Sequence, residues 1–147
     1  MKDQEKILVP LDGSVISEAV LPSVERLATA FGAGICLLQV VPSMILPVTM
    51  EGYANCEQIT VACTKEGEAY LRKMEKRLKA KGFEVESLLL SGDEAQQILE
   101  QADRKDIALI AMTTHGRSGV SRWVMGSVAE KVVRHATKPI FLVRSVA

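Results

Sequence analysis

The sequence lacks the features that mark several large classes of protein. Its 147 residues carry 18 basic and 18 acidic side chains, so the formal net charge is zero. A chain without excess charge has no general attraction for nucleic acid or for an anionic membrane. No apolar run approaches the roughly 20 residues that span a bilayer, and the charged start MKDQEK differs from a signal peptide. We therefore expect a cytoplasmic protein without nucleic-acid or membrane partners.

Cysteine is also scarce. Cys36, Cys56 and Cys63 are odd in number and form no C-x-x-C pair, so a disulfide framework is not expected. The two histidines are not spaced with these cysteines as zinc ligands usually are. We predict no metal-binding side chains.

Five short apolar runs recur along the chain, each the length of a strand. Segments with helical periodicity separate them, and this alternation predicts a parallel sheet with helices on both faces. The composition, 48% hydrophobic and 24% charged, fits one globular domain over residues 1–147. The predicted strands cover residues 6–11, 34–41, 83–90, 107–112 and 139–144.

The first two predicted helices differ in how clearly they begin. The first has Ser14 as a candidate N-cap, and Pro22 should kink it or restart it, because an interior proline removes a helical hydrogen bond. The second covers about 57–81. The apolar segment 42–60 before it contains two prolines and reads as a long loop.

The last two predicted helices begin at recognisable caps. Asp93 is the expected N-cap of the third. The fourth begins near Ser127 in the sequence SVAE, which fits a capping box of Ser127 and Glu130.

The apolar pattern also predicts the order of the strands. Runs 6–11 and 107–112 are continuously apolar, as strands buried on both faces are, whereas 83–90 begins with the alternation of an edge strand. The order 3-2-1-4-5 satisfies this, giving a single-domain, open, five-stranded, Rossmann-like α/β fold. Its topological switch point lies between strands 1 and 4, where ligands bind at the carboxyl ends.

The segment TTHGRSGVSRWVMGS, residues 113–127, follows the fourth strand. Gly116 and Gly119 would let the backbone approach a ligand, and the amides of such a loop can form an anion-binding nest. The helix start at Gly126 and Ser127 adds free amides and a positive dipole end. Loop and helix together predict a cradle for a polyphosphate, to which Arg117 could add positive charge.

Rival interpretations of this segment fit less well. A Walker A loop needs a lysine that is absent, and no G-x-G-x-x-G follows the first strand. A hydrolase would use Ser127 as nucleophile, His115 as base and Asp12 as orienting group. The G-x-S-x-G elbow of such enzymes is missing.

Two stretches, KILVPLDGS and HGRSGVSRWVMGS, resemble the universal stress protein family in its ATP-binding branch. That branch has Gly, two residues, Gly, nine residues, Gly, then Ser or Thr. Gly116, the nine residues 117–125, Gly126 and Ser127 fit the latter part, while Thr113 stands where the first glycine would be. The resemblance implies an adenine nucleotide alpha hydrolase-like fold, in agreement with the predicted strand order.

The resemblance also implies a ligand and its contacts. ATP, with or without Mg²⁺, would lie at the switch point, with Asp12 at the ribose and the backbone of Val40 at the adenine edge. The implied contact residues are Pro10, Leu11, Asp12 and Val40 for the nucleoside, and Met112, Thr113, Gly116, Gly126, Ser127 and Val128 for ribose and phosphates. From the residues alone, Asp12 with Gly13 and Ser14 is equally a turn sequence.

The implied function is a nucleotide-dependent stress-response regulator that forms a homodimer through its last strand. We expect binding without fast turnover, hence no enzyme, because no lysine, carboxylate pair or water-positioning base accompanies the loop. Two other functions stay open. One is an interaction module of the same fold that binds no nucleotide, and the other is a nucleotide-hydrolysing or nucleotidyl-transferring enzyme.

Overall fold

The structure, a computed structural model, describes residues 4–42, 50–115 and 125–144, and for residues 50–58 only the backbone. The strands are β1 (Lys6–Pro10), β2 (Gly34–Val41), β3 (Val85–Ser91), β4 (Ile107–Thr113) and β5 (Ile140–Val143). The helices are the 3₁₀-helix η1 (Ser17–Val20) and the α-helices α1 (Leu21–Phe31), α2 (Met50–Ala80), α3 (Glu94–Ala102) and α4 (Ser127–His135).

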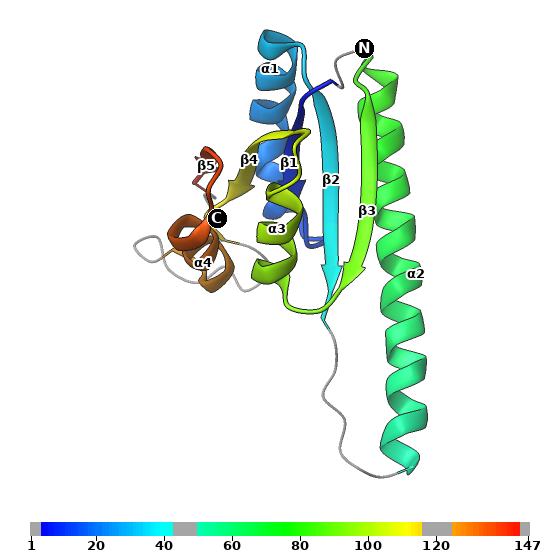
Figure 1. Cartoon of the computed structure of the whole chain (residues 1–147). Helices are drawn as coiled ribbons and strands as arrows, with labels where there is room; N and C mark the ends of the chain where they lie inside the picture. Colours follow the sequence, from blue (N-terminus) through cyan, green and yellow to red (C-terminus); the bar gives the residue numbers. More distant parts are fainter. Residues whose placement is uncertain (1–3, 43–49, 116–124, 145–147) are drawn as a thin grey trace.

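The five strands form one sheet in the order β3-β2-β1-β4-β5, with every neighbouring pair parallel. Leu8 at the centre of β1 stands opposite Cys36 on β2 and Ile110 on β4. Figure 1 shows β1 in the middle, with the long helix α2 beside β3. The predicted fold class and strand order are confirmed, including the edge position of β3.

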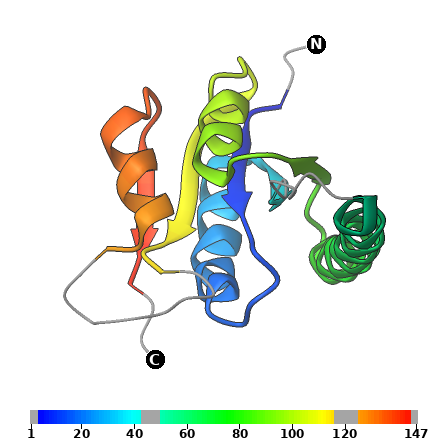
Figure 2. The same ribbon diagram turned by 90° about the horizontal axis from the view of Figure 1, so that it is seen from below.

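Alternate residues of the central strands point to opposite faces of the sheet. Ile7 and Val9 pack in a cluster with α1 and α2, whereas Leu8 packs in a second cluster with α3 and α4. All three side chains are fully buried. Both faces are therefore covered, which explains the continuous apolar runs. Viewed along the sheet, α2 and α4 lie at its opposite ends (Figure 2).

The first helical segment begins differently from the prediction. Ser14 does not cap α1, which begins at Leu21 after η1. Instead its Oγ accepts a hydrogen bond from the amide of Ser17, at 3.2 Å, where η1 starts. Pro22 lies in the first turn of α1, where its missing N–H costs nothing. The restart at Pro22 is confirmed, and the Ser14 cap of α1 is wrong.

Helix α2 begins at Met50, so the predicted loop over 42–60 is wrong from residue 50 onward. Both prolines of that segment precede the helix, and nothing after them prevents helix formation. The start of α2 extends beyond the carboxyl ends of β2 and β3 (Figure 1). Nearer its end, Leu71, Met74 and Leu78 are buried against the sheet, as their spacing predicts.

The predicted N-cap of α3 is present in the structure, whereas the predicted capping box of α4 is not. Asp93 Oδ2 accepts the amide of Gln96 at 2.9 Å, so the predicted cap of α3 is confirmed. At α4 the N-cap is Gly126, and no side chain caps the helix. Glu130 instead pairs with Arg134 at 2.7 Å. The predicted capping box is therefore wrong, and the Ser127 hydroxyl is not used for capping.

Three general expectations concern the described part of the chain. No helix in it is both long and apolar enough to cross a bilayer. Cys36 and Cys63 are free thiols there. No three histidine, cysteine or acidic side chains among these residues converge as metal ligands.

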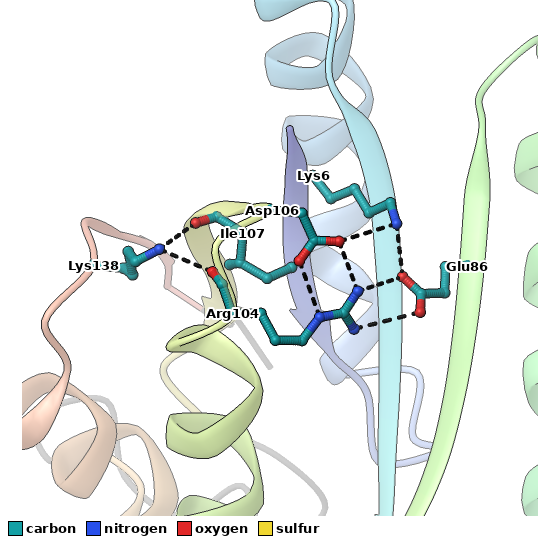
Figure 3. Close-up of polar contacts among 6 residues, drawn as sticks. All are labelled: Lys6, Glu86, Arg104, Asp106, Ile107 and Lys138. Carbon is teal, nitrogen blue, oxygen red and sulfur yellow. Dashed lines mark hydrogen bonds and ion pairs between the residues drawn. The ribbon is translucent and has the colours of Figure 1, made fainter. Parts of the chain in front are cut away.

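Four charged side chains form a closed cluster at the amino ends of the strands (Figure 3). Lys6 Nζ lies 3.0 Å from Glu86 Oε2 and 3.2 Å from Asp106 Oδ2. Arg104 binds Asp106 through two parallel hydrogen bonds of 3.0 and 2.7 Å and reaches Glu86 at 3.1 Å. The cluster joins β1, β3 and the α3–β4 connection.

These contacts shift the ionisation of both carboxyl groups in the same direction. Burial opposes the ionisation of Glu86, but hydrogen bonds from Arg104 and Lys6 outweigh it and hold the pKa of Glu86 below its usual range. The hydrogen bond from Arg104 likewise lowers the pKa of Asp106. A carboxyl whose folded pKa is depressed stabilises the fold above its unfolded pKa of about 4. That contribution is lost as the pH falls through the folded value.

Arg104→Leu should lower the free energy of unfolding by about 1 kcal/mol near neutral pH, because the paired, partly exposed carboxylates lose their bidentate partner. The loss should shrink as the pH falls below about 4 and through the depressed folded pKa values of Glu86 and Asp106, where both carboxyls become protonated. Urea unfolding at neutral pH and at a pH below those folded values measures it. Arg134→Leu is the control, since its pair with Glu130 is 70% and 50% exposed, and we expect a change within about 0.5 kcal/mol. An Arg104 effect of equal size at both pH values would contradict this assignment.

Candidate functional site

A cavity of about 400 Å³ lies where β1 and β4 end and α4 begins. This is the predicted switch point. After β1 the chain continues to β2 on one side of the β1–β4 pair, and after β4 it continues to β5 on the other side. The lining residues are Pro10, Asp12, Ser17, Glu94, Met112, Thr113, Thr114, His115, Gly126, Ser127, Val128 and Ala129.

Most of the site residues expected from the sequence that the structure describes line this cavity: Pro10, Asp12, Met112, Thr113, Gly126, Ser127 and Val128. Leu11 does not, because its side chain is buried in the core and its amide donates to the carbonyl of Leu38 at 2.8 Å. Val40, the last but one residue of β2, lines two neighbouring cavities instead. The remaining candidates, Gly116, Arg117 and Gly119, lie outside the described residues.

The sequence did not identify every lining residue. Glu94, the first residue of α3, follows β3 after a two-residue connection and lines the cavity. The strand order could have suggested it, because the carboxyl ends of neighbouring parallel strands share one edge. Ser17 is 4% exposed and was hidden inside the predicted first helix.

The turn after β1 holds Asp12 at the cavity edge. Asp12 Oδ1 accepts the amide of Ser14 at 2.9 Å and also the Ser14 hydroxyl. The Asp12 amide donates to Ser17 Oγ at 3.3 Å. Gly13 between them has φ 85°, a conformation that favours glycine. The turn interpretation of this sequence is confirmed, and the turn also fixes a carboxylate at the site.

Hydrogen bonds hold the end of β4 to its own following residues, to β5 and to the start of α4. Thr113, 6% exposed, donates its hydroxyl to the carbonyl of His115 at 2.7 Å. The amide of Thr114 donates to Val143 on β5 at 3.0 Å, and the Thr114 carbonyl accepts the amide of Gly126 at 2.8 Å. Thr114 therefore joins the end of β4 to β5 on one side and to the start of α4 on the other.

Gly126 lies too close to the end of β4 for a residue with a side chain. Its φ of −60° is open to any residue. A Cβ placed there would lie 2.9 Å from the carbonyl oxygen of Thr114 and 3.5 Å from the Cα of His115. Both neighbours are backbone atoms that cannot turn aside, so a larger residue would push α4 away from β4.

The cavity is lined by groups of opposite polarity. The first-turn amides of α4, at Ser127, Val128 and Ala129, have no intrahelical acceptor, and the helix dipole adds positive potential there. Asp12 and Glu94 add two acidic residues to the lining, and Glu94 also lines a neighbouring cavity together with Ser127 and Val128. Among the lining residues that the structure describes, none is a lysine or arginine. An anionic group fits best against α4, and hydrogen-bond donors fit best beside Asp12.

The hydrolase interpretation can be tested against the same geometry. Asp12, His115 and Ser127 do line one cavity. However, no hydrogen bond joins Ser127 to His115 in the described contacts, and Asp12 Oδ1 is bonded to Ser14. The described hydrogen bonds therefore do not include the Ser127–His115 contact that would activate a serine nucleophile.

Proteins from several organisms resemble this chain along most of its length. A universal stress protein of Methanocaldococcus jannaschii is 33% identical over 141 residues, which cover 95% of this chain and 82% of that protein. One from Methanothermobacter thermautotrophicus is 33% identical over 144 residues and covers 96% of both chains.

Solved structures show the same fold. UspA from Lactobacillus plantarum superposes with a TM-score of 0.84 at 20% identity, and the match covers 98% of this chain and 100% of that one. An Arabidopsis thaliana universal stress protein family protein with AMP bound gives 0.68 at 20% identity over 97% and 93% of the two chains. A universal stress protein from Archaeoglobus fulgidus in complex with dAMP gives 0.67 at 22% identity over 95% and 98%.

The family model for the universal stress protein family matches residues 4–144, nearly the whole sequence. This match agrees with the two relatives at 33% identity and with the sheet order described above. The chain therefore belongs to the universal stress protein family.

Proposed function

We propose that this protein binds an adenine nucleotide, ATP, in the cavity between β1 and β4 and acts as a nucleotide-dependent regulator of a stress response. The observation that carries the proposal is the polarity of the cavity. The first turn of α4, whose amides have no intrahelical acceptor, and Asp12 line one cavity. A nucleotide has the matching polarity, with anionic phosphates at one end and hydroxyl and amino donors at the other.

The size and walls of the cavity also suit this ligand. Its volume of about 400 Å³ lies in the range of small-molecule sites. Pro10, Met112 and Val128 add apolar residues to the cavity wall. In the proposed pose the phosphates lie against Ser127 and Val128, the ribose lies at Asp12, and the base extends toward Val40. Mg²⁺ would accompany the phosphates and offset the carboxylates beside them.

The bound nucleotides of other proteins support the ligand class but not its details. AMP and dAMP occupy proteins of the same fold at 20% and 22% identity, where likeness establishes the fold alone. The choice of a triphosphate rests on the sequence motif that ends at Gly126 and Ser127.

We propose that turnover is slow or absent. Among the residues that line the cavity and are described, no lysine or arginine stabilises a transferring phosphoryl group. A nucleotide-hydrolysing enzyme is the second candidate, because His115 and Ser127 lie at the same cavity as Asp12.

The proposed assembly is a homodimer through β5. This strand is an edge of the sheet and pairs only with β4 among the described strands. Phe141 at its centre is 39% exposed, a large apolar side chain on an open strand edge. Pairing with a second copy would cover both features.

Titration calorimetry with ATP, with and without Mg²⁺, tests the ligand directly. Nucleotide at about 100 times its dissociation constant should stabilise the fold by roughly 2.7 kcal/mol, visible as a rise in melting temperature. Absence of both heat and a melting shift at millimolar ATP would leave the interaction module as the function. Phosphate release measured over hours on the same samples should show less than one turnover per minute, and faster release would favour the enzyme.

Thr113→Val should reduce nucleotide affinity about fivefold, the worth of one hydrogen bond of about 1 kcal/mol. Valine keeps the shape of threonine but leaves the carbonyl of His115 without its donor. Thr113→Ser keeps the donor and should bind nearly as the parent does. Equal affinities for all three proteins would show that the Thr113 contact does not order the site.

Phe141→Lys should convert the dimer to a monomer in sedimentation experiments, because a lysine ammonium would be buried at the paired edges. Phe31→Lys is the matched control, since Phe31 is 66% exposed at the end of α1. A Phe141→Lys protein that stays dimeric would place the interface elsewhere.

A further inference from the structure

The proposed nucleotide site has few positive charges. Among its lining residues that the structure describes, two are acidic, Asp12 and Glu94, none is a lysine or arginine, and His115 alone can become a cation near neutral pH. A nucleotide would bring several more negative charges into this cavity. The protonation state of His115 therefore decides whether any described side chain of the site is positively charged.

The imidazole of His115 lies against the start of α4. A Cβ on Gly126 would lie 3.7 Å from His115 Nδ1 and 3.5 Å from its Cα. The ring is thus next to the first-turn amides, where the phosphates lie in the proposed pose. His115 is half-buried and lines the cavity, so a bound ligand can reach it.

Hydrogen bonds hold the backbone of His115 and of the residues before it. The hydroxyl of Thr113 donates to the His115 carbonyl at 2.7 Å. The amide of Thr114 donates to Val143 at 3.0 Å, and the Thr114 carbonyl accepts the amide of Gly126 at 2.8 Å. None of the hydrogen bonds or ion pairs in the described part of the chain involves the imidazole. The histidine is therefore held in place while its ring stays available to a ligand.

Several elements bring charge to the surroundings of His115. The positive end of the α4 dipole lies on one side, and the cavity also contains Asp12 from the turn after β1 and Glu94 from α3. In the first two turns of α4 and directly after β5, the charged side chains are Glu130, Lys131 and Arg144, none of which lines the cavity. Bound phosphates would add negative charge beside the imidazole. Protonation of the ring and binding of phosphate would therefore favour each other, by linkage.

We propose that protonated His115 is a phosphate-binding residue of this site and makes its nucleotide affinity depend on pH. The inference rests on the proposed function, because it requires phosphates at the start of α4. Histidine is the side chain whose charge ordinarily changes between about pH 5 and 8. As the pH falls through this range the ring takes a proton from solvent and can donate a charge-assisted hydrogen bond to a phosphate oxygen. Occupancy of the nucleotide-dependent regulator would then rise when the pH falls.

Calorimetric titration with ATP at pH 6 and pH 8, with Mg²⁺ in constant excess, tests the charge of His115. His115→Asn keeps an N–H donor but cannot become a cation. It should lose about tenfold in affinity at pH 6, the worth of a charge-assisted hydrogen bond, and change less than about twofold at pH 8. Protonation of the nucleotide itself also varies with pH, but it is the same for every variant and cancels in the comparison.

Three controls separate this charge from a structural effect. His135→Asn removes the other of the two histidines, which is exposed in the last turn of α4, and should behave as the parent does. His115→Lys carries a permanent charge and should bind ATP tightly at both pH values. Adenosine, which has no phosphate, should bind the parent and His115→Asn alike at both pH values. The parent should also take up protons on binding ATP near pH 7, measured in buffers of different ionisation enthalpy.

The outcomes distinguish this inference from the proposed function. A His115→Asn protein that keeps the pH dependence of the parent would overturn the inference and leave ATP binding intact. So would a His115→Lys protein as weak as His115→Asn at both pH values, which would give His115 a structural role only. Absence of proton uptake by the parent would also overturn it, and this measurement needs no substitution. A parent that binds no ATP at either pH would refute the proposed function and this inference with it.

Discussion

The site depends on the close contact between the start of α4 and the end of β4. The amide of Gly126 donates to the carbonyl of Thr114 at 2.8 Å, while the amide of Thr114 is held by Val143 on β5. The absence of a side chain at Gly126 allows this approach, since a Cβ would meet the same carbonyl at 2.9 Å. The start of α4 consequently lines the same cavity as Asp12. Without this contact β4 and α4 would still be consecutive elements of the chain, but they would not line one cavity.

The amino ends of the strands are closed by a different kind of contact. Lys6 and Arg104 neutralise Glu86 and Asp106, and Lys138 donates to the carbonyls of Arg104 and Ile107 at 3.1 and 2.6 Å (Figure 3). Two cations balance two carboxylates, so the cluster adds little net field across the sheet. The electrostatic potential at the carboxyl ends of the strands therefore depends on the nearby charges of α4, Asp12 and Glu94. This division explains how a chain of zero net charge could hold the proposed anionic ligand.

The sequence predicted the sheet better than it predicted the site. The strand order could be predicted because strands buried on both faces are continuously apolar, whereas an edge strand alternates. The Asp93 cap could be predicted because a capping side chain binds an amide only three residues further along the chain. The Ser127 and Glu130 capping box was wrong because the same letters also fit a helix whose N-cap is Gly126. The space required at Gly126 and the role of Ser17 depend on residues distant in sequence, which local patterns do not encode. Leu11 was included with its neighbours, although strand alternation turns it into the core.

The carboxylates of Asp12 and Glu94 line the same cavity as the start of α4, and this has an energetic consequence for the proposed ligand. A nucleotide would bring negative charge toward carboxylates that already carry it. The first-turn amides and the dipole of α4, together with Mg²⁺, would have to offset that repulsion, so the affinity should depend on the metal ion as well as on the helix start.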